Sequence, residues 1–305
     1  MAYKVITFDG GGICGLFSAA LLDRLAAEVP GLVDDADLLA GTSTGGIIAL
    51  CLAAGKKPAD LVRLYGDNGR KIFDDSWFDN VLDLGTAIGA DYDNSQLKKL
   101  LTRELGAVTL SKLGKRVLVP TFDLCAEASG DRPMTWKPKF FHNFPGNDSD
   151  GAELAVDIAL RTSAAPTYFP AYQGFIDGGV VSNNPSMAAL ALALDKRAGK
   201  QSLEDVVLLS ISTGSDAKFI KGESLDWGWG QWARPLVAIM INGVMGVADF
   251  QCQQLLGDNY RRLDTFFDRA VNLDDVKPKT LEYLKQQANA MPIGGVVNWL
   301  KSVWR

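Results

Sequence analysis

Histidine is almost absent from this sequence, because His142 is the only one among 305 residues. Histidine is the side chain that most often moves protons in enzymes near neutral pH. Any proton transfer here therefore depends on that single imidazole or on another group such as a carboxylate. The sequence also lacks closely spaced cysteines, long apolar runs and blocks of basic residues, and each of these absences argues against a class of function.

The four cysteines are too far apart along the chain to supply the paired ligands of a zinc site. They lie mostly in apolar stretches, which is typical of reduced thiols in a cytoplasmic protein. The sequence contains no run of 18 apolar residues, so we expect no membrane span. Its first residues begin a strand-like pattern and do not show the pattern of a signal peptide. We therefore expect a cytoplasmic protein that contacts membranes at most peripherally. The cysteines are Cys14, Cys51, Cys125 and Cys252.

The net charge is −5, and no cluster of lysine and arginine predicts a phosphate-binding surface. We therefore expect no nucleic acid polymer as a partner. The excess of acidic over basic residues also disfavours electrostatic binding to anionic membranes. With 47% hydrophobic residues, the composition is typical of a globular protein with a substantial core.

Strand-like and helix-like runs alternate over the first two hundred residues. This order predicts an α/β fold with a mainly parallel central sheet covered by helices on both faces. Because no low-complexity linker interrupts the chain, we expect a single domain over residues 1–305, with a core at about 3–215 and a C-terminal helical layer at about 216–305. Strands are expected at residues 3–8, 37–40, 116–123, 135–142, 175–176 and 206–211. Helices are expected at residues 15–29, 47–54, 58–70, 97–105, 154–163 and 187–194.

Three glycine-rich turns each follow a predicted strand, at Gly10–Gly12, Gly41–Gly46 and Gly178–Gly179. The turns after parallel strands gather at one edge of an open sheet, where ligands bind. If the strand before Asp177 runs parallel to the others, the three turns converge on one site.

The second turn reads Gly41-Thr42-Ser43-Thr44-Gly45 and matches the nucleophile elbow G-x-S-x-G. Gly41 and Gly45 permit a sharp strand-to-helix turn. Such a turn presents the Ser43 hydroxyl at a helix N-terminus, where free N–H groups favour negative charge. A capped turn without a catalytic role is the alternative, because serine and threonine are good N-caps.

A serine nucleophile needs a base, and Asp177 is a better candidate than His142. Asp177 ends a predicted strand and is followed by two glycines, which leave its carboxylate unshielded. A carboxylate in a dry site can accept a serine proton when its pKa is raised. In the usual α/β-hydrolase order the histidine comes last, whereas about half of this chain follows His142. The alternative role for Asp177 is to cap a turn.

Gly10, Gly11 and Gly12 offer backbone N–H groups without side chains, which can form an oxyanion hole. Extended to Gly15, the same stretch also matches the dinucleotide-binding pattern G-x-G-x-x-G between a strand and a helix. That fold requires an acidic residue at the end of the second strand, where this chain has its glycine-serine turn. The oxyanion hole is therefore the favoured interpretation.

The order and spacing of these motifs resemble the patatin-like phospholipase family. Two accessory segments, one before and one after the turn at Asp177, are similar to the family as well. The likeness spans roughly residues 3–215. The stretches that carry it are residues 9–15, 41–46, 163–170, 177–179 and 183–185.

The resemblance implies a three-layer α/β/α sandwich and a Ser–Asp dyad that works without histidine. By position, Ser43 is the nucleophile, Asp177 is its base and Gly10–Gly12 form the oxyanion hole. It further implies a calcium-independent lipid acyl hydrolase, without cofactor or metal, that cleaves fatty acyl esters of phospholipids or glycerolipids. Alternatives remain open: an effector that degrades membranes only after binding a small-molecule activator such as a signal nucleotide, an esterase or acyltransferase acting on other esters, or a non-enzymatic role.

One position departs from the family's pattern. Cys14 stands where members often carry arginine or lysine before the last glycine of the first motif. Because a cation there could bind lipid phosphate, its loss favours neutral lipids or simple esters as substrates.

The C-terminal third contains two apolar helical patterns, at residues 229–257 and 296–304. Either could form a lid or face a membrane, but a core helix is the favoured interpretation of both. The Gly- and Trp-rich stretch at 215–232 is expected to begin this layer.

Overall fold

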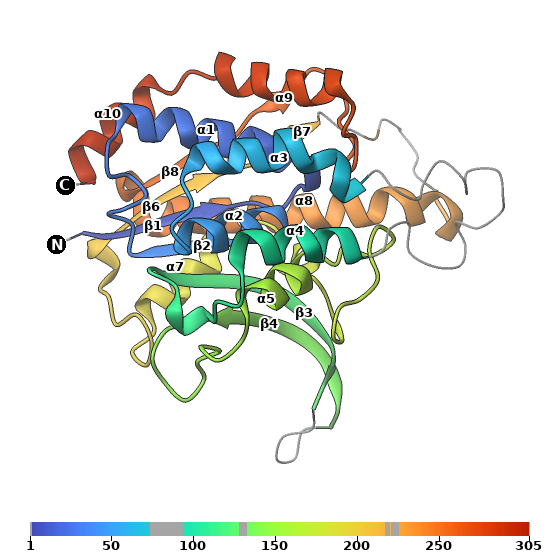
Figure 1. The fold of residues 1–305 in the computed structure, drawn as a ribbon, viewed down its shortest axis with the longest axis horizontal. Helices are drawn as coiled ribbons and strands as arrows, with labels where there is room; N and C mark the ends of the chain where they lie inside the picture. Colours follow the sequence, from blue (N-terminus) through green and yellow to red (C-terminus); the bar gives the residue numbers. More distant parts are fainter. Residues whose placement is uncertain (1, 74–93, 128–132, 217–219, 221–225, 305) are drawn as a thin grey trace.

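A computed structural model describes residues 2–73, 94–127, 133–216, 220 and 226–304. It has a central sheet between layers of helices, and the two chain termini lie on the same side of the molecule (Figure 1). Part of the expected start of the C-terminal layer, at 217–219 and 221–225, lies outside the described residues.

Within the described residues, the central sheet has seven strands: β1 (Tyr3–Phe8), β2 (Leu38–Gly41), β3 (Arg116–Ala126), β4 (Thr135–His142), β5 (Phe175–Asp177), β6 (Val206–Ile211) and β8 (Tyr260–Leu263). Their order is β4-β3-β2-β1-β6-β8, with β5 paired to β3. β3, β2, β1, β6 and β8 run parallel, which confirms the predicted mainly parallel sheet. All six predicted strands form, and β8 is a further parallel strand that sequence analysis missed. A separate pair is formed by β7 (Ser215–Asp216) and β9 (Phe266–Phe267).

Helices form at the six places predicted in the first two hundred residues and at both helical patterns predicted in the C-terminal third, and two more complete the described part of the fold (Figure 1). The predicted ones are α1 (Gly15–Glu28), α2 (Thr44–Ala53), α3 (Pro58–Phe73), α4 (Ser95–Leu105), α5 (Ala155–Thr162), α7 (Ser186–Leu194), α8 (Trp229–Leu256) and α10 (Gly294–Val303). The other two are α6 (Gly179–Ser182) and α9 (Pro278–Ala290).

The side chains of β1 alternate between two hydrophobic cores, as expected for a strand that is buried on both faces. Ile6 and Phe8 belong to the core that contains residues of α1 to α5, α9 and α10. Val5 belongs to the other core, with residues of α7 and the end of α8. The sheet is therefore the middle layer of a three-layer α/β/α sandwich, as the sequence predicted.

The strand that ends at Asp177 does not run parallel to the others, so the assumption under which the three turns were expected to converge is wrong. β5 is antiparallel to β3. The physical reason is that β2 already pairs with the first residues of β3 as its parallel neighbour, from Arg116 to Leu118. Beyond the end of β2, the longer β3 leaves backbone groups without a partner, and the short β5 pairs with them from the opposite direction.

α8 differs from the core helix that its composition favours. Among its described side chains, only three in the C-terminal half are fully buried, those of Ala248, Cys252 and Leu256. From its middle to its C-terminal end it also exposes five large apolar side chains, Ile239, Met240, Val247, Phe250 and Leu255. By contrast, α10 buries Val297, Trp299 and Leu300 as predicted. No described helix is both long enough and apolar enough to span a bilayer.

Candidate active site

Ser43 occupies a sharp turn between β2 and α2. Its backbone has φ 55° and ψ −124°, a conformation that residues other than glycine adopt rarely and at a cost of about 1–3 kcal/mol. The residue is the N-cap of α2, so the first free N–H groups and the positive end of the helix dipole lie beside it. This is the backbone geometry that a nucleophile elbow requires.

Gly41 and Gly45 close the turn because neither position has room for a side chain. A Cβ atom on Gly41 would collide with the carbonyl oxygen of Gly45, and one on Gly45 would collide with the carbonyl oxygen of Phe8 on β1. The predicted elbow glycines therefore allow the close approach of the turn to itself and to the central strand.

Thr162, at the end of α5, holds the turn in place. Its Oγ1 accepts a hydrogen bond from the Ser43 N–H at 2.9 Å and donates one to the carbonyl oxygen of Pro120 at 2.6 Å. Sequence analysis did not single out Thr162. Its only local signal is a polar residue at the end of an otherwise apolar helix face.

Asp177 reaches Ser43 because β5 and β2 meet end to end along the same edge of β3. On that edge Ala40 pairs with Leu118, and Asp177 pairs with Thr121, three residues further along. β4 pairs with both Leu118 and Thr121 and so takes the opposite edge. Three strand residues span about 10 Å, so the carboxyl ends of β2 and β5 face each other. The antiparallel strand thus produces the convergence that was expected from a parallel one.

The Asp177 carboxyl group is buried and hydrogen-bonded to the Ser43 hydroxyl. The Gly179 N–H donates a hydrogen bond to Asp177 Oδ1 at 2.7 Å, and the Asp177 N–H donates one to the carbonyl oxygen of Ala164 at 2.9 Å. Burial raises the pKa of Asp177 to about 6, although the hydrogen bonds from Ser43 and Gly179 oppose this change. Such a carboxyl group is mostly ionised at neutral pH and is more basic than an ordinary carboxylate.

The first glycine turn lies against the same serine, because a Cβ atom on Gly10 would be 3.2 Å from the Cβ of Ser43. The Gly10 N–H donates a hydrogen bond to the carbonyl oxygen of Asn183 at 3.0 Å. It is therefore occupied, contrary to the expectation for an oxyanion donor. Within the described part of the chain, no group accepts a hydrogen bond from the N–H of Gly11 or Gly12. The N–H groups of Gly11 and Gly12 are therefore the remaining candidates for the oxyanion-hole donors.

Two side chains from distant segments fix the glycine turn. Asn183 Nδ2 donates hydrogen bonds to the Gly10 carbonyl oxygen at 3.2 Å and to Met245 Sδ on α8 at 2.9 Å. Thr213 Oγ1, just after β6, donates to the same carbonyl oxygen at 2.9 Å. Asn183 was singled out only as part of the accessory stretch 183–185, and Thr213 was not singled out at all, because these contacts are long-range and leave no local sequence pattern.

Asp9, the residue immediately before the glycine turn, forms a buried ion pair with Arg262 on β8. The Arg262 guanidinium donates to both carboxylate oxygens, at 2.6 Å and 3.3 Å, and to Ser210 Oγ at 2.8 Å. The Asp9 side chain is 1% exposed and that of Arg262 is 10% exposed. The pair therefore anchors the end of β1 from inside the protein.

The three turns line a cavity of about 740 Å³. Ser43, Asp177 and the three glycines of the first turn form part of its wall. The remainder is mainly apolar and comes from α2, α4, α8, residues 165–169 and residues 267–273. A cavity of this size and lining suits a ligand with a hydrocarbon chain. Its apolar side chains include Ile47, Leu97, Phe169, Ile241, Met245 and Phe267.

His142 is not part of this cavity. It ends β4, where it pairs with Leu118, and its backbone N–H donates to the Asp150 carboxylate at 3.0 Å. The imidazole is buried, and this burial lowers its pKa. Asp177, and not His142, is therefore the titratable side chain beside Ser43.

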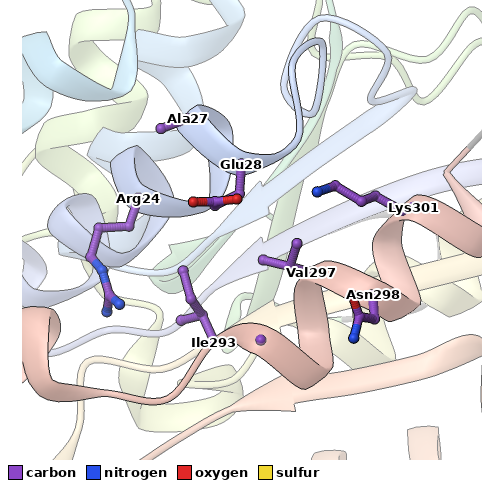
Figure 2. A pocket seen from close by; sticks show the side chains of 8 residues that line it. Arg24, Ala27, Glu28, Ile293, Val297, Asn298 and Lys301 are labelled. Atoms are coloured by element: carbon purple, nitrogen blue, oxygen red, sulfur yellow. The ribbon is translucent and has the colours of Figure 1, made fainter.

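A second cavity, of about 530 Å³, lies between α1 and α10 (Figure 2). Figure 2 shows Arg24 and Glu28 of α1 facing Val297 and Lys301 of α10. Arg24 donates a hydrogen bond to the carbonyl oxygen of Met291 at 3.0 Å and so supports the end of α9. The described residues that line this cavity include no serine, cysteine or histidine, so it offers no comparable nucleophile.

Among the described residues there is neither a disulfide nor a cluster of metal ligands. All four cysteines are free, and only Cys125 is exposed. No three side chains of His, Cys, Asp or Glu gather so that they could hold a metal ion.

Comparison with known proteins connects this geometry to a family. A family model described as "Patatin-like phospholipase" matches residues 6–190. Protein teg of Priestia megaterium is 30% identical over 99% of this chain and 99% of its own length. A cGAMP-activated phospholipase of Pseudomonas aeruginosa is 33% identical over 86% of this chain and 78% of its own length. Patatin-like protein 2 of Arabidopsis thaliana is 28% identical over 94% of this chain and 82% of its own length.

Proposed function

Because this chain belongs to the patatin-like phospholipase family of hydrolases that act on lipid esters, we propose that it is a calcium-independent lipid acyl hydrolase with Ser43 as nucleophile. Its substrates are fatty acyl esters of phospholipids or glycerolipids. The observation that carries the proposal is the hydrogen-bonded pair of Ser43 and buried Asp177 at the wall of an apolar cavity.

In the first half of the reaction, Asp177 accepts the Ser43 proton while the Ser43 oxygen attacks the acyl carbonyl carbon. The tetrahedral intermediate collapses, the bond to the alcohol oxygen breaks, and the proton passes from Asp177 to the leaving alcohol. In the second half, water attacks the acyl-enzyme and gives a proton to Asp177. The fatty acid leaves, and the proton returns to Ser43. A pKa of about 6 allows Asp177 to act as base and then as acid near neutral pH.

The negative charge on the tetrahedral intermediate needs donors that are already in position. In this proposal the N–H groups of Gly11 and Gly12 provide them. Support comes from the occupied Gly10 N–H and from the two side chains, Asn183 and Thr213, that hold the turn through the Gly10 carbonyl oxygen. A loop fixed in this way has little reorganisation to undergo during the reaction.

The enzyme in this proposal is cytoplasmic and touches lipid surfaces through the outer face of α8. The opposite face of the helix lines the cavity, through residues such as Ile241 and Met245. Residues 235–248 include no charged side chain, which suits a helix that lies in a lipid interface. The outward apolar side chains, between 44% and 64% exposed, are Ile239, Met240, Val247 and Phe250.

We further propose that residues 1–305 act as one domain. The C-terminal layer contributes to both functional and structural parts of the fold. α8 closes one side of the cavity, while α9 and α10 share a hydrophobic core with α1. Removal of this layer would expose both the cavity and the hydrophobic core around α1 to solvent.

The test is release of fatty acid from phosphatidylcholine vesicles and from a soluble short-chain ester, both in the presence of a chelator. We expect wild type to cleave both substrates and Ser43→Ala to lose at least about 10³-fold in rate. Ser202→Ala, at an exposed serine, is the matched control and should retain full activity. Activity that survives in Ser43→Ala would overturn the nucleophile assignment, and activity that requires calcium would overturn the metal-independent mechanism.

A ligand-activated phospholipase is the second candidate function. It is favoured by the Pseudomonas aeruginosa relative and by a further one from Vibrio cholerae, 31% identical over 94% of this chain and 90% of its own length, both named cGAMP-activated phospholipases. The same vesicle assay with and without cGAMP separates the two candidates. Ser43-dependent release that occurs only with cGAMP would favour ligand activation, whereas equal rates would exclude this activator.

A further inference from the structure

Ser163 carries a buried hydroxyl group in the wall of the cavity beside Ser43. The residue lines that cavity and is 8% exposed. Among the described residues, its Oγ has no hydrogen-bond partner. Buried polar atoms nearly always have a partner, either in the protein or in a molecule bound to it. This hydroxyl is therefore placed to meet a polar atom of a molecule that enters the cavity.

Ser163 stands between the two residues that hold the dyad. Thr162 Oγ1 accepts a hydrogen bond from the Ser43 N–H at 2.9 Å. The carbonyl oxygen of Ala164 accepts one from the Asp177 N–H at 2.9 Å. Consecutive Cα atoms are about 3.8 Å apart, so the residue with the unpaired hydroxyl is next to the anchor of the nucleophile and next to the anchor of its base.

The hydroxyl lies on the opposite side of Ser43 from the glycine turn. β2, which leads into Ser43, has β1 on one side and β3 on the other. The glycine turn follows β1, whereas Thr162 donates a hydrogen bond to the Pro120 carbonyl oxygen on β3. Asp177 also pairs with β3. Because Asp177 has to protonate the leaving alcohol, an ester whose carbonyl oxygen points at the glycine turn places its alcohol oxygen on the Ser163 side.

The water that hydrolyses the acyl-enzyme occupies the place that the alcohol has left, because deacylation reverses acylation with water in place of the alcohol. Such a water gives one hydrogen to Asp177 while its oxygen bonds to the acyl carbon. Its second hydrogen needs an acceptor, and a serine hydroxyl can accept as well as donate. An alcohol in the same place has a carbon substituent instead of that second hydrogen. The Ser163 hydroxyl is therefore suited to a feature that water has and an alcohol lacks.

We propose that Ser163 positions the hydrolytic water and so directs the acyl-enzyme towards hydrolysis and away from acyl transfer to alcohols. The inference rests on the proposed lipid acyl hydrolase function and adds a residue to the same site. In deacylation, the water oxygen bonds to the acyl carbon, one proton passes to Asp177, and the remaining hydrogen is donated to Ser163 Oγ. The bond from the acyl carbon to Ser43 Oγ then breaks, and the proton on Asp177 moves to that oxygen. Ser163 neither gains nor loses a proton.

The test measures how the acyl group of p-nitrophenyl butyrate divides between water and methanol. Initial rates of butyric acid and methyl butyrate formation are measured by gas chromatography in buffer that contains methanol. Both products arise from the same butyryl-enzyme, so their ratio reports deacylation and does not depend on the fraction of active enzyme. We expect Ser163→Ala to raise the ratio of methyl butyrate to butyric acid by about three- to tenfold, which corresponds to one hydrogen bond.

Ser163→Cys separates the loss of a hydrogen bond from a gain of space. Alanine leaves extra room for the methyl group of methanol, whereas cysteine fills the position with a sulfur atom that accepts hydrogen bonds only weakly. We expect Ser163→Cys to raise the product ratio as Ser163→Ala does. Ser202→Ala, at an exposed serine, is the matched control and should keep the wild-type ratio.

Melting temperatures test whether the Ser163 hydroxyl serves the fold instead. Since it makes no hydrogen bond within the described protein, Ser163→Ala should melt no lower than wild type. Thr162→Ala removes two hydrogen bonds at the neighbouring residue and should melt roughly 3 °C lower.

Each outcome has a distinct meaning. An unchanged product ratio in Ser163→Ala, or a rise that is absent from Ser163→Cys, would overturn the inference while leaving the Ser43 mechanism intact. A loss of stability in Ser163→Ala as large as that in Thr162→Ala would reveal a structural role and would overturn it too. If wild type releases no p-nitrophenol in a Ser43-dependent manner, the proposed function itself is wrong.

Discussion

The carboxyl group of Asp177 is controlled by two opposing effects at the scale of single residues. Burial raises its pKa to about 6, and hydrogen bonds from Ser43 and Gly179 limit the increase. The result is a carboxylate that is mostly ionised at pH 7 but holds a proton better than an exposed aspartate does. In the proposed mechanism this balance replaces the imidazole of a conventional triad.

The pH dependence of catalysis should report this carboxyl group. Asp177 works as a base only when ionised, so kcat/KM should rise with pH through about 6 and reach a plateau near pH 8. Asp177→Asn should lose about 10²–10⁴-fold in kcat/KM. Stopped assays from pH 4.5 to pH 9 with a soluble ester measure both effects. Asp205→Asn, at an exposed position, is the control. Unchanged turnover in a folded Asp177→Asn protein would contradict the base assignment.

At the scale of elements, α8 combines two apolar faces that a single stretch of sequence does not distinguish. One face lines the cavity, through Ile241 and Met245, and the opposite face exposes large side chains to solvent. A core helix would have buried both. The arrangement places an exposed apolar surface on the helix that closes the lipid cavity, which is where an enzyme acting on membrane lipids would meet the bilayer.

Charges on the outer face of α8 should separate surface binding from chemistry. Met240→Asp and Val247→Asp should each reduce vesicle hydrolysis by about tenfold or more, because a carboxylate is costly in a lipid interface. Cleavage of a soluble ester should stay within about twofold of wild type. Asn289→Asp adds the same charge at an exposed polar position on α9 and is the matched control. Vesicle flotation and both assays check the result. Equal losses on vesicles and on the soluble ester would argue against a membrane-contact face.

At the scale of the whole molecule, a buried ion pair links strands from opposite ends of the sequence across the intervening β6. β1 begins at Tyr3, and β8 starts only at Tyr260. The Asp9–Arg262 pair joins them across 253 positions of sequence, immediately behind the glycine turn. Both side chains are almost completely buried. Loss of one partner leaves an uncompensated charge in the interior, a far greater cost than loss of an exposed pair.

Arg262→Met should therefore reduce the free energy of unfolding by about 3–5 kcal/mol. The adjacent Arg261 pairs with Asp258, whose side chain is fully exposed, so Arg261→Met should cost no more than about 1 kcal/mol. Urea unfolding followed by circular dichroism measures both values. If the two variants are equally stable, the buried pair does not anchor the sheet in the way that we infer.

The strands and helices of the first two hundred residues could be predicted because hydrophobic periodicity and glycine turns are local signals. The same holds for the elbow at Ser43, whose glycines are required by contacts within the turn and with a neighbouring strand. β8 escaped prediction because Tyr-Arg-Arg-Leu contains two arginines, one of which is buried only through its pairing with Asp9. Thr162 and Thr213 escaped for a similar reason, since each acts through a backbone group far away in the sequence.

The sequence by itself determined the α/β class, the parallel sheet and the two residues, Ser43 and Asp177, that meet in the cavity. Only the tertiary structure decided how they meet, because β5 arrives antiparallel and abuts the end of β2. It also decided which glycine N–H groups are unoccupied, and which face of α8 is exposed. Local patterns record the conformation and burial of a segment, whereas strand direction and hydrogen-bond partners depend on groups that only folding brings together.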